Sequence, residues 1–269
     1  MTNNLSRRRL LLGSAAFAGG TALGFAVPHV LLAASGDWGD LVGRIVYDGT
    51  PPERPRLKVD KDVDCCGKFD IRDEQIMVGP AGGLANVFVF VRTRKVDVCP
   101  ELVESLPKQV KLDNRDCIFK PHCLTLWQAK QGLHIVNSDP IAQNVAFSPI
   151  GDAPANIVMA AVKDPKEPVT ADWKFARPQV LPVKIACNYH PWESAHIFPR
   201  DNPYVAITGL DGAFRLPKLP VGKLEIQAWQ EKAGYLDTSD WPKGRFEVTI
   251  KPGTNDVGTI RVPPALLEK

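Results

Sequence analysis

Short runs of apolar residues separated by turn residues dominate the chain after residue 36 and predict strands more than helices. Residues 41–50 are expected to form a strand that ends in a turn, and the nearly continuous apolar run at 84–91 predicts a buried strand. Further strands are expected at 117–126, 133–137, 180–186, 195–198, 205–208, 246–250 and 256–262. A helical turn is expected at 101–106 and an irregular connection at 151–178.

The last third of the chain carries a hairpin pattern. Asp211-Gly212 is followed by alternating residues, a proline- and glycine-containing turn at 217–222, and further alternation up to Trp229. This arrangement predicts two strands joined as a β-hairpin. The sequence shows no repeat with a period of about 20–50 residues, which excludes a solenoid.

Composition supports an ordinary folded protein of 269 residues with 44% hydrophobic and 23% charged residues. It excludes a disordered tail, a collagen-like fibre and a polytopic membrane protein. The formal net charge is +3, but Arg7, Arg8 and Arg9 account for it; the rest of the chain has 30 basic and 30 acidic residues. A nucleic-acid partner therefore has no support.

Residues 1–35 have the pattern of an export signal. Arginines at 7–9 precede a mildly apolar, glycine-containing stretch that leads to the small residues Ala33-Ala34-Ser35. The paired arginines before leucines are similar to a twin-arginine signal, and an ordinary secretory signal is the alternative. An uncleaved anchor is less consistent, because Pro28 and His29 interrupt the apolar run. We expect a periplasmic or otherwise exported protein with no membrane span once the signal is removed.

All six cysteines follow this signal, at positions 65, 66, 99, 117, 123 and 187. In an oxidising compartment an even number of cysteines favours disulfides. The sequence alone allows many pairings, although the adjacent Cys65 and Cys66 are poor partners for each other because a bond between neighbours strains the backbone.

Two resemblances to known families are carried by different residues. Gly43-Arg44-Ile45-Val46, the 85–89 strand, and Thr208 with Asp211-Gly212-Ala213-Phe214 and Leu219-Pro220-Val221-Gly222 resemble the carboxypeptidase regulatory-like domain, a transthyretin-like β-sandwich. Phe119-Lys120-Pro121, Gly132, Asn137-Ser138-Asp139-Pro140, Asn144 and Cys187-Asn188-Tyr189-His190 resemble a cupredoxin.

The order of these motifs implies an all-β chain in which one sandwich is inserted into the other. Residues 37–98 and 203–262 would form the discontinuous carboxypeptidase regulatory-like sandwich, and residues 107–202 the cupredoxin-like domain. The whole chain is similar to exported bacterial proteins described as methylamine-utilisation or plastocyanin-like.

The cupredoxin resemblance implies a copper site of two imidazoles, a thiolate and a weak axial ligand. Cys187 and His190 keep the spacing of that motif, but Glu193 stands at the axial methionine position and Gln143 at the other histidine position. Met77 and Met159 lie outside the ligand loop. This set would hold Cu(II) or Zn(II) with altered geometry and without fast one-electron exchange, and a vestigial, metal-free site is the alternative.

Other residues have weaker claims. His122, His134 and His196 are each expected to be structural or solvent-facing. The family resemblance implies a Cys66–Cys117 disulfide, with two buried thiols as the alternative, and we also consider a Cys99–Cys123 pair.

Three functions remain open. The first is an exported metal-binding or electron-transfer protein with a redox partner. The second is a metal-free binding or structural protein of the cell envelope. The third is a hydrolase with Cys187 as nucleophile and His190 as base, which the spacing disfavours because two residues so close on one tight loop rarely have the geometry for proton relay. We expect a protein that is not an enzyme.

Overall fold

The computed structural model describes residues 38–268. The expected signal at 1–35 lies outside them. Within the described part, no helix has the length and apolar character needed to cross a membrane.

Strands make up most of the described chain, as the hydrophobic pattern predicts. They are β1 (Trp38–Tyr47), β2 (Phe88–Val91), β3 (Gln109–Arg115), β4 (Ile118–Lys120), β5 (Cys123–Trp127), β6 (Gly132–Asn137), β7 (Gln143–Phe147), β8 (Ala155–Met159), β9 (Val169–Trp173), β10 (Val183–Ala186), β11 (Ser194–Arg200), β12 (Val205–Ile207), β13 (Ala213–Pro220), β14 (Gly222–Gln230), β15 (Gly234–Tyr235), β16 (Arg245–Ile250) and β17 (Gly253–Val262). The helices of this part are α1 (Val63–Cys66) and α2 (Pro100–Ser105), with 3-10 turns η1 (Pro242–Gly244) and η2 (Pro264–Leu266). The expected all-β class and the helical turn near 101–106 are confirmed.

One pair of sheets is built from the first and last strands. The order β13-β1-β17 forms one sheet, and β12-β2-β14-β15, with β16 paired to β14, forms the other. Leu41 and Leu216 from the first sheet share a hydrophobic core with Val89 and Ile226 from the second. Burial of the apolar faces of both sheets against each other stabilises this pair.

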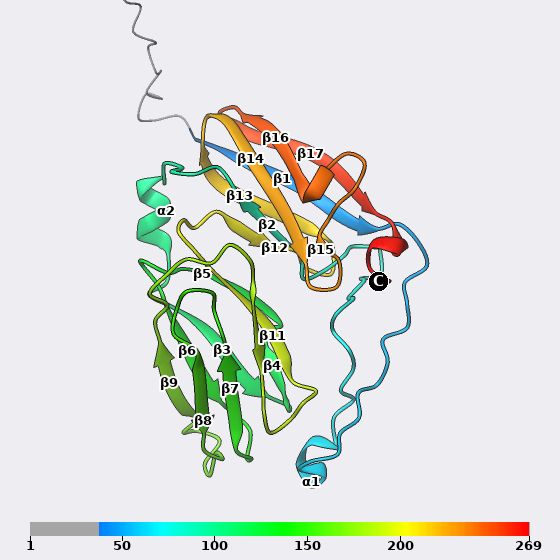
Figure 1. The fold of residues 1–269 in the computed structure, drawn as a ribbon, viewed down its shortest axis with the longest axis vertical. Helices are drawn as coiled ribbons and strands as arrows, with labels where there is room; N and C mark the ends of the chain where they lie inside the picture. Colours follow the sequence, from blue (N-terminus) through cyan, green and yellow to red (C-terminus); the bar gives the residue numbers. More distant parts are fainter. Residues whose placement is uncertain (1–37, 269) are drawn as a thin grey trace, which may run out of the picture. The chain divides into compact units, whose positions relative to one another are not determined.

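A second pair of sheets is built from β3–β11, the strands that lie between β2 and β12 in the sequence. Its sheets have the orders β4-β3-β6-β9 and β5-β11-β10-β7-β8. Leu112 and Ile135 from one sheet pack with Val145, Ile185 and Ile197 from the other. In Figure 1, which is coloured by sequence position, β3–β9 of this second pair are green, whereas the first pair includes the blue β1 and the orange and red strands.

The two pairs of sheets meet through aromatic side chains. Phe88 and Phe90 of β2 cluster with Phe198 of β11 and with Cys123. The Phe198 ring stands edge-on to both phenylalanines, with centroids 5.8 Å from Phe88 and 4.9 Å from Phe90. Such edge-to-face contacts fix the relative orientation of packed aromatic rings.

A long excursion leaves the first pair of sheets after β1 and returns before β2. Its two arms meet at an isolated bridge between Arg56 and Arg72, and α1 lies at its tip (Figure 1). The excursion matters because α1 lies against the candidate site described below.

Two local predictions are wrong. The segment 151–178 is only partly irregular, because it contains β8 and β9, which are edge strands with alternate side chains exposed: Asn156 and Val158 in β8, Thr170 and Asp172 in β9. Residues 213–229 do not form a hairpin, because β13 pairs with β1 whereas β14 pairs with β2, β15 and β16. The turn between β13 and β14 thus carries the chain from one sheet to the facing sheet.

Candidate metal centre

The loop between two neighbouring strands carries three of the expected ligands. Cys187 follows β10, and Glu193 immediately precedes β11, which pairs with β10. The Cys187 amide donates to the Glu193 carbonyl oxygen at 3.2 Å, and the Glu193 amide donates to the His190 carbonyl oxygen at 2.9 Å. These bonds close the loop and bring the three side chains to one end of the sheet.

Gln143 supplies the fourth expected ligand from the adjacent strand. It is the first residue of β7, which pairs antiparallel with β10. All four residues are buried: Cys187 is 3% exposed, Glu193 1%, and His190 and Gln143 0%. The structure therefore brings together the four residues that the sequence pattern singled out.

Their donor atoms converge on the His190 ring. His190 Nδ1 lies 3.6 Å from Cys187 Sγ, 2.9 Å from Gln143 Oε1 and 3.3 Å from Glu193 Oε1. Cys187 Sγ is in turn 3.6 Å from Gln143 Oε1. A tetrahedral ion with bonds of about 2.0–2.3 Å holds its donors roughly 3.3–3.7 Å apart, so of these four separations the one between His190 and Gln143 must lengthen.

One buried oxygen in this cluster has no hydrogen bond. Glu193 Oε2 accepts from Asn114 Nδ2 at 2.9 Å, whereas Glu193 Oε1 has no hydrogen-bond partner among the described residues. A buried carboxylate oxygen without a donor is costly unless a cation compensates it, and both a protonated His190 ring and a metal ion are such cations. Here Oε1 lies close to the same imidazole nitrogen that the sulfur approaches, so these residues fit a metal ion.

Outer groups orient two of the four side chains. Asp62, at the start of α1, is 2.8 Å from His190 Nε2. Gln143 Nε2 donates to Asp139 Oδ2 at 3.1 Å, which turns the amide oxygen of Gln143 toward the cluster. Carboxylates that hold the second nitrogen of a histidine are typical of metal sites in proteins.

The same contacts set the charge of His190. Burial lowers the pKa of this imidazole, but its contacts with Cys187, Glu193 and Asp62 outweigh burial and raise the pKa to about 10. The imidazolium therefore balances the buried carboxylate when no metal is bound. A metal ion would replace the proton on Nδ1 and carry its charge.

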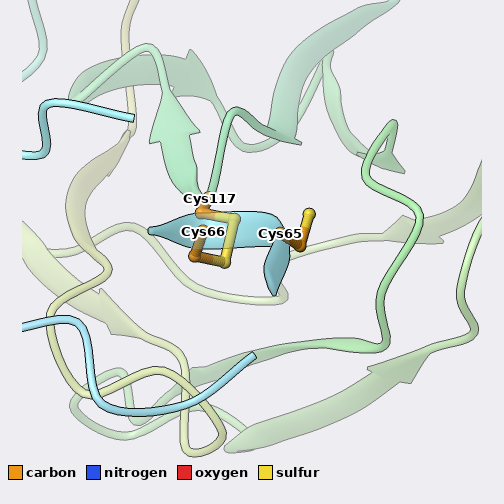
Figure 2. Close-up of side chains that lie close together, drawn as sticks. All are labelled: Cys65, Cys66 and Cys117. Carbon is orange, nitrogen blue, oxygen red and sulfur yellow. A yellow bond between two sulfur atoms is a disulfide. The ribbon is translucent and has the colours of Figure 1, made fainter. Parts of the chain in front are cut away.

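A disulfide between Cys66 and Cys117 fastens the excursion beside this cluster. It joins α1 to the turn between β3 and β4, with Cα atoms 5.5 Å apart. Figure 2 shows Cys65 next to this bond, and its sulfur is a free thiol. Burial and the charge of Asp139 raise the pKa of the Cys65 thiol, so it is a weak nucleophile.

The other considered disulfide does not form between the described residues Cys99 and Cys123. Both thiols are free and buried, and they have different neighbours. The Cys99 amide donates to the Tyr204 hydroxyl at 3.2 Å, whereas Cys123 belongs to the aromatic cluster with Phe88 and Phe198. The two thiols are thus held apart by the packing of separate segments.

Several neighbours of the site carry no signal in the sequence. Asp62 and Asn114 contact the site from segments remote in sequence, and no spacing pattern marks them. His122 and His196 do not join the Cys187 cluster but face each other and Glu231. His134 lies on a sheet surface, where it pairs with Asp172 at 2.7 Å.

Comparison with known proteins gives a limited likeness. No family model matches the chain. No curated protein matches it. Among solved structures, the Cu(I) form of a methionine-to-alanine mutant of amicyanin is 11% identical over 42% of this chain and 98% of its own, with a TM-score of 0.27.

Two further structures show the same degree of similarity. Amicyanin from Paracoccus versutus is 14% identical over 42% of this chain and 97% of its own, with a TM-score of 0.28. A copper-containing nitrite reductase from Thermus scotoductus is 15% identical over 39% of this chain and 27% of its own, with a TM-score of 0.29. The likeness thus covers less than half of this chain.

Proposed function

We propose that this chain is an exported, cupredoxin-like metal-binding protein whose site consists of Cys187, His190, Glu193 and Gln143, with copper as the metal. One observation carries this proposal: the buried donor atoms of Cys187, Gln143 and Glu193 all lie 2.9–3.6 Å from His190 Nδ1, while Glu193 Oε1 has no hydrogen bond among the described residues. Thiolate and imidazole ligands together favour copper or zinc, and copper binds more tightly to a given set of such donors.

The ligand set indicates metal binding more than rapid electron transfer. Two oxygen donors replace an imidazole and a thioether, and oxygen donors favour the harder Cu(II) over Cu(I). When bound, the copper ion would supply redox chemistry, and this chain holds the ligands and keeps water from them. A redox or envelope partner is part of the proposal.

We also infer the domain arrangement and the location from the sequence pattern. The strands β1 and β2 precede, and β12–β17 follow, the strands of the second pair of sheets, which supports an insertion of residues 107–202 between 37–98 and 203–262. The pattern of residues 1–35 supports export through a twin-arginine-like signal.

A metal-free structural protein is the second candidate. The observation in its favour is that His190 already has partners at both ring nitrogens, Gln143 and Asp62, so most of the cluster is satisfied without an ion. A hydrolase is less consistent with the structure, because Cys187 is 3% exposed and a nucleophile must reach its substrate.

Copper titration of the purified protein tests the proposal. We expect one Cu(II) to bind at this cluster, with a thiolate-to-copper absorption band that disappears in Cys187→Ser. Cys99→Ser removes another buried free thiol and is the matched control, which should keep the band. If Cys187→Ser binds copper with the stoichiometry and affinity of the wild type, the site is vestigial and the second candidate is favoured.

A further inference from the structure

A second cluster of potential ligands lies outside the Cys187 site. We propose that His122, His196 and Glu231 form a separate site for a divalent transition-metal ion of the zinc type. The nitrogen and oxygen atoms of these side chains all lie within 4.8 Å of one another.

Strand pairing places the two imidazoles side by side. His122 immediately precedes β5, and His196 lies in β11, the parallel neighbour of β5. The His196 amide donates to the His122 carbonyl oxygen at 2.8 Å, and the ring centroids are 6.1 Å apart. The backbone therefore holds His196 within a strand and His122 at the start of the neighbouring one, as a metal site requires.

The carboxylate comes from the other pair of sheets. Glu231 directly follows β14, and its two oxygens divide between the histidines. Glu231 Oε1 is 2.7 Å from His122 Nε2, and Oε2 is 3.2 Å from His196 Nδ1. Ligands bound to zinc at about 2.0–2.2 Å stand roughly 3.3–3.6 Å apart, so small movements suffice to admit an ion.

One buried nitrogen of this cluster, on His196, has no hydrogen bond among the described residues. The side chains of His122 and Glu231 are each 6% exposed and that of His196 is 10% exposed. His196 Nδ1 nevertheless makes no hydrogen bond among the described residues, even though a carboxylate oxygen is close. An ion between the two atoms would satisfy both, whereas a proton in this geometry does not.

A further carboxylate lies behind His122. Glu74 Oε2 is 3.6 Å from His122 Nδ1, the ring nitrogen that faces away from Glu231. His122 Nδ1 makes no hydrogen bond among the described residues, and a small approach of Glu74 would give it the carboxylate partner that metal-binding histidines commonly have. Glu74 and His122 also line a cavity of about 190 Å³, which adjoins the cluster on the His122 side.

The donor chemistry identifies the class of metal. Two imidazoles and one carboxylate are the protein ligands of many zinc sites and suit divalent iron or cobalt as well. Since the ligands lie just before β5, in β11 and just after β14, a bound ion would link the two pairs of sheets. We therefore infer a structural role, with thermal stability that depends on the metal.

Zinc binding to the purified full chain tests this site. The variants His196→Gln and Glu231→Gln each remove one ligand and should lose one equivalent of bound zinc. His134→Gln removes a histidine that also pairs with a carboxylate and is the matched control, which should keep it. Zinc should raise the melting temperature of the wild type and of His134→Gln more than that of the ligand variants, which keep only the Cys187 cluster for zinc.

Two further variants keep the outcome interpretable. Glu74→Gln changes no ligand and should weaken zinc binding by about 10–100-fold, which tests the site even if a ligand variant fails to fold. Cys187→Ser should retain this zinc equivalent, so that a failure of the Cys187 site is distinguishable. Unchanged zinc binding in folded His196→Gln and Glu74→Gln, or its complete loss in Cys187→Ser, would overturn the proposal.

Discussion

At the level of single residues, the oxygen donors Glu193 and Gln143 decide the chemistry of the candidate copper site. Both are buried, and both are held by a neighbour: Asn114 binds the Glu193 carboxylate and Asp139 binds the Gln143 amide. Hard oxygen donors held in place in this way favour Cu(II) over the softer Cu(I). The site is therefore expected to prefer Cu(II).

Replacing both oxygen donors should convert the site. The double variant Gln143→His/Glu193→Met supplies the second imidazole and the thioether that a blue-copper site uses. We expect an intense thiolate-to-copper band and a higher reduction potential than the wild type, measured by visible spectroscopy and voltammetry. The same variant with Cys187→Ser is the control; a double variant that binds copper without this band would contradict the ligand assignment.

Asp62 offers a test of the outer contacts. Asp62→Ala removes the carboxylate from His190 Nε2 and should weaken copper binding by about 10–100-fold. Asp64→Ala removes an exposed acidic residue from the same helix and should leave the affinity unchanged. Equal losses in both variants, measured by competition with a copper chelator, would indicate a general charge effect instead.

At the level of elements, the excursion that bears α1 depends on its disulfide. Beside Cys66 and Cys117, the small core around α1 buries Ile71, and its other hydrophobic residues are only partly buried, so we expect the covalent bond to hold Asp62 near His190.

Removing the disulfide should loosen this element. We expect Cys66→Ser/Cys117→Ser to lower the free energy of unfolding by about 2–4 kcal/mol in urea denaturation. Copper affinity should also fall toward that of Asp62→Ala. Cys65→Ser leaves the bond intact and should change neither quantity; wild-type copper affinity in the double variant would show that the disulfide does not position Asp62.

The elements also show what the sequence could predict. The buried strand at Phe88–Val91 follows from its apolar run, because a strand covered on both faces needs no polar residues. The sequence does not predict β8 and β9, because these edge strands expose one face and therefore lack a continuous apolar run. The supposed hairpin failed because turn residues mark a reversal of direction but not the sheet that receives the next strand.

At the level of the whole molecule, the aromatic contact joins the two pairs of sheets. Phe198→Ala should lower the free energy of unfolding by about 3–5 kcal/mol, because a large cavity would form between Phe88 and Phe90. Val158→Ala, at a 60% exposed position, should change it by less than about 0.5 kcal/mol. A comparably small effect of Phe198→Ala in urea denaturation would show that the contact does not contribute to stability.

The sequence predicts the two candidate sites to different degrees, because only the first has most of its residues on one loop. Cys187, His190 and Glu193 lie on one loop, so their spacing in the sequence already indicates a cluster. Gln143 could be added only through the resemblance to cupredoxins. His122, His196 and Glu231 meet only because β5 pairs with β11 and the end of β14 approaches them, and no local pattern encodes such long-range pairing.

Anomalous diffraction from crystals of the copper-loaded protein tests the central claim most directly. We predict a copper peak between Cys187 Sγ, His190 Nδ1 and Glu193 Oε1, at about 2.0–2.3 Å from each ligand. Electron density that keeps the His190–Gln143 hydrogen bond, with no copper among these side chains, would contradict the account.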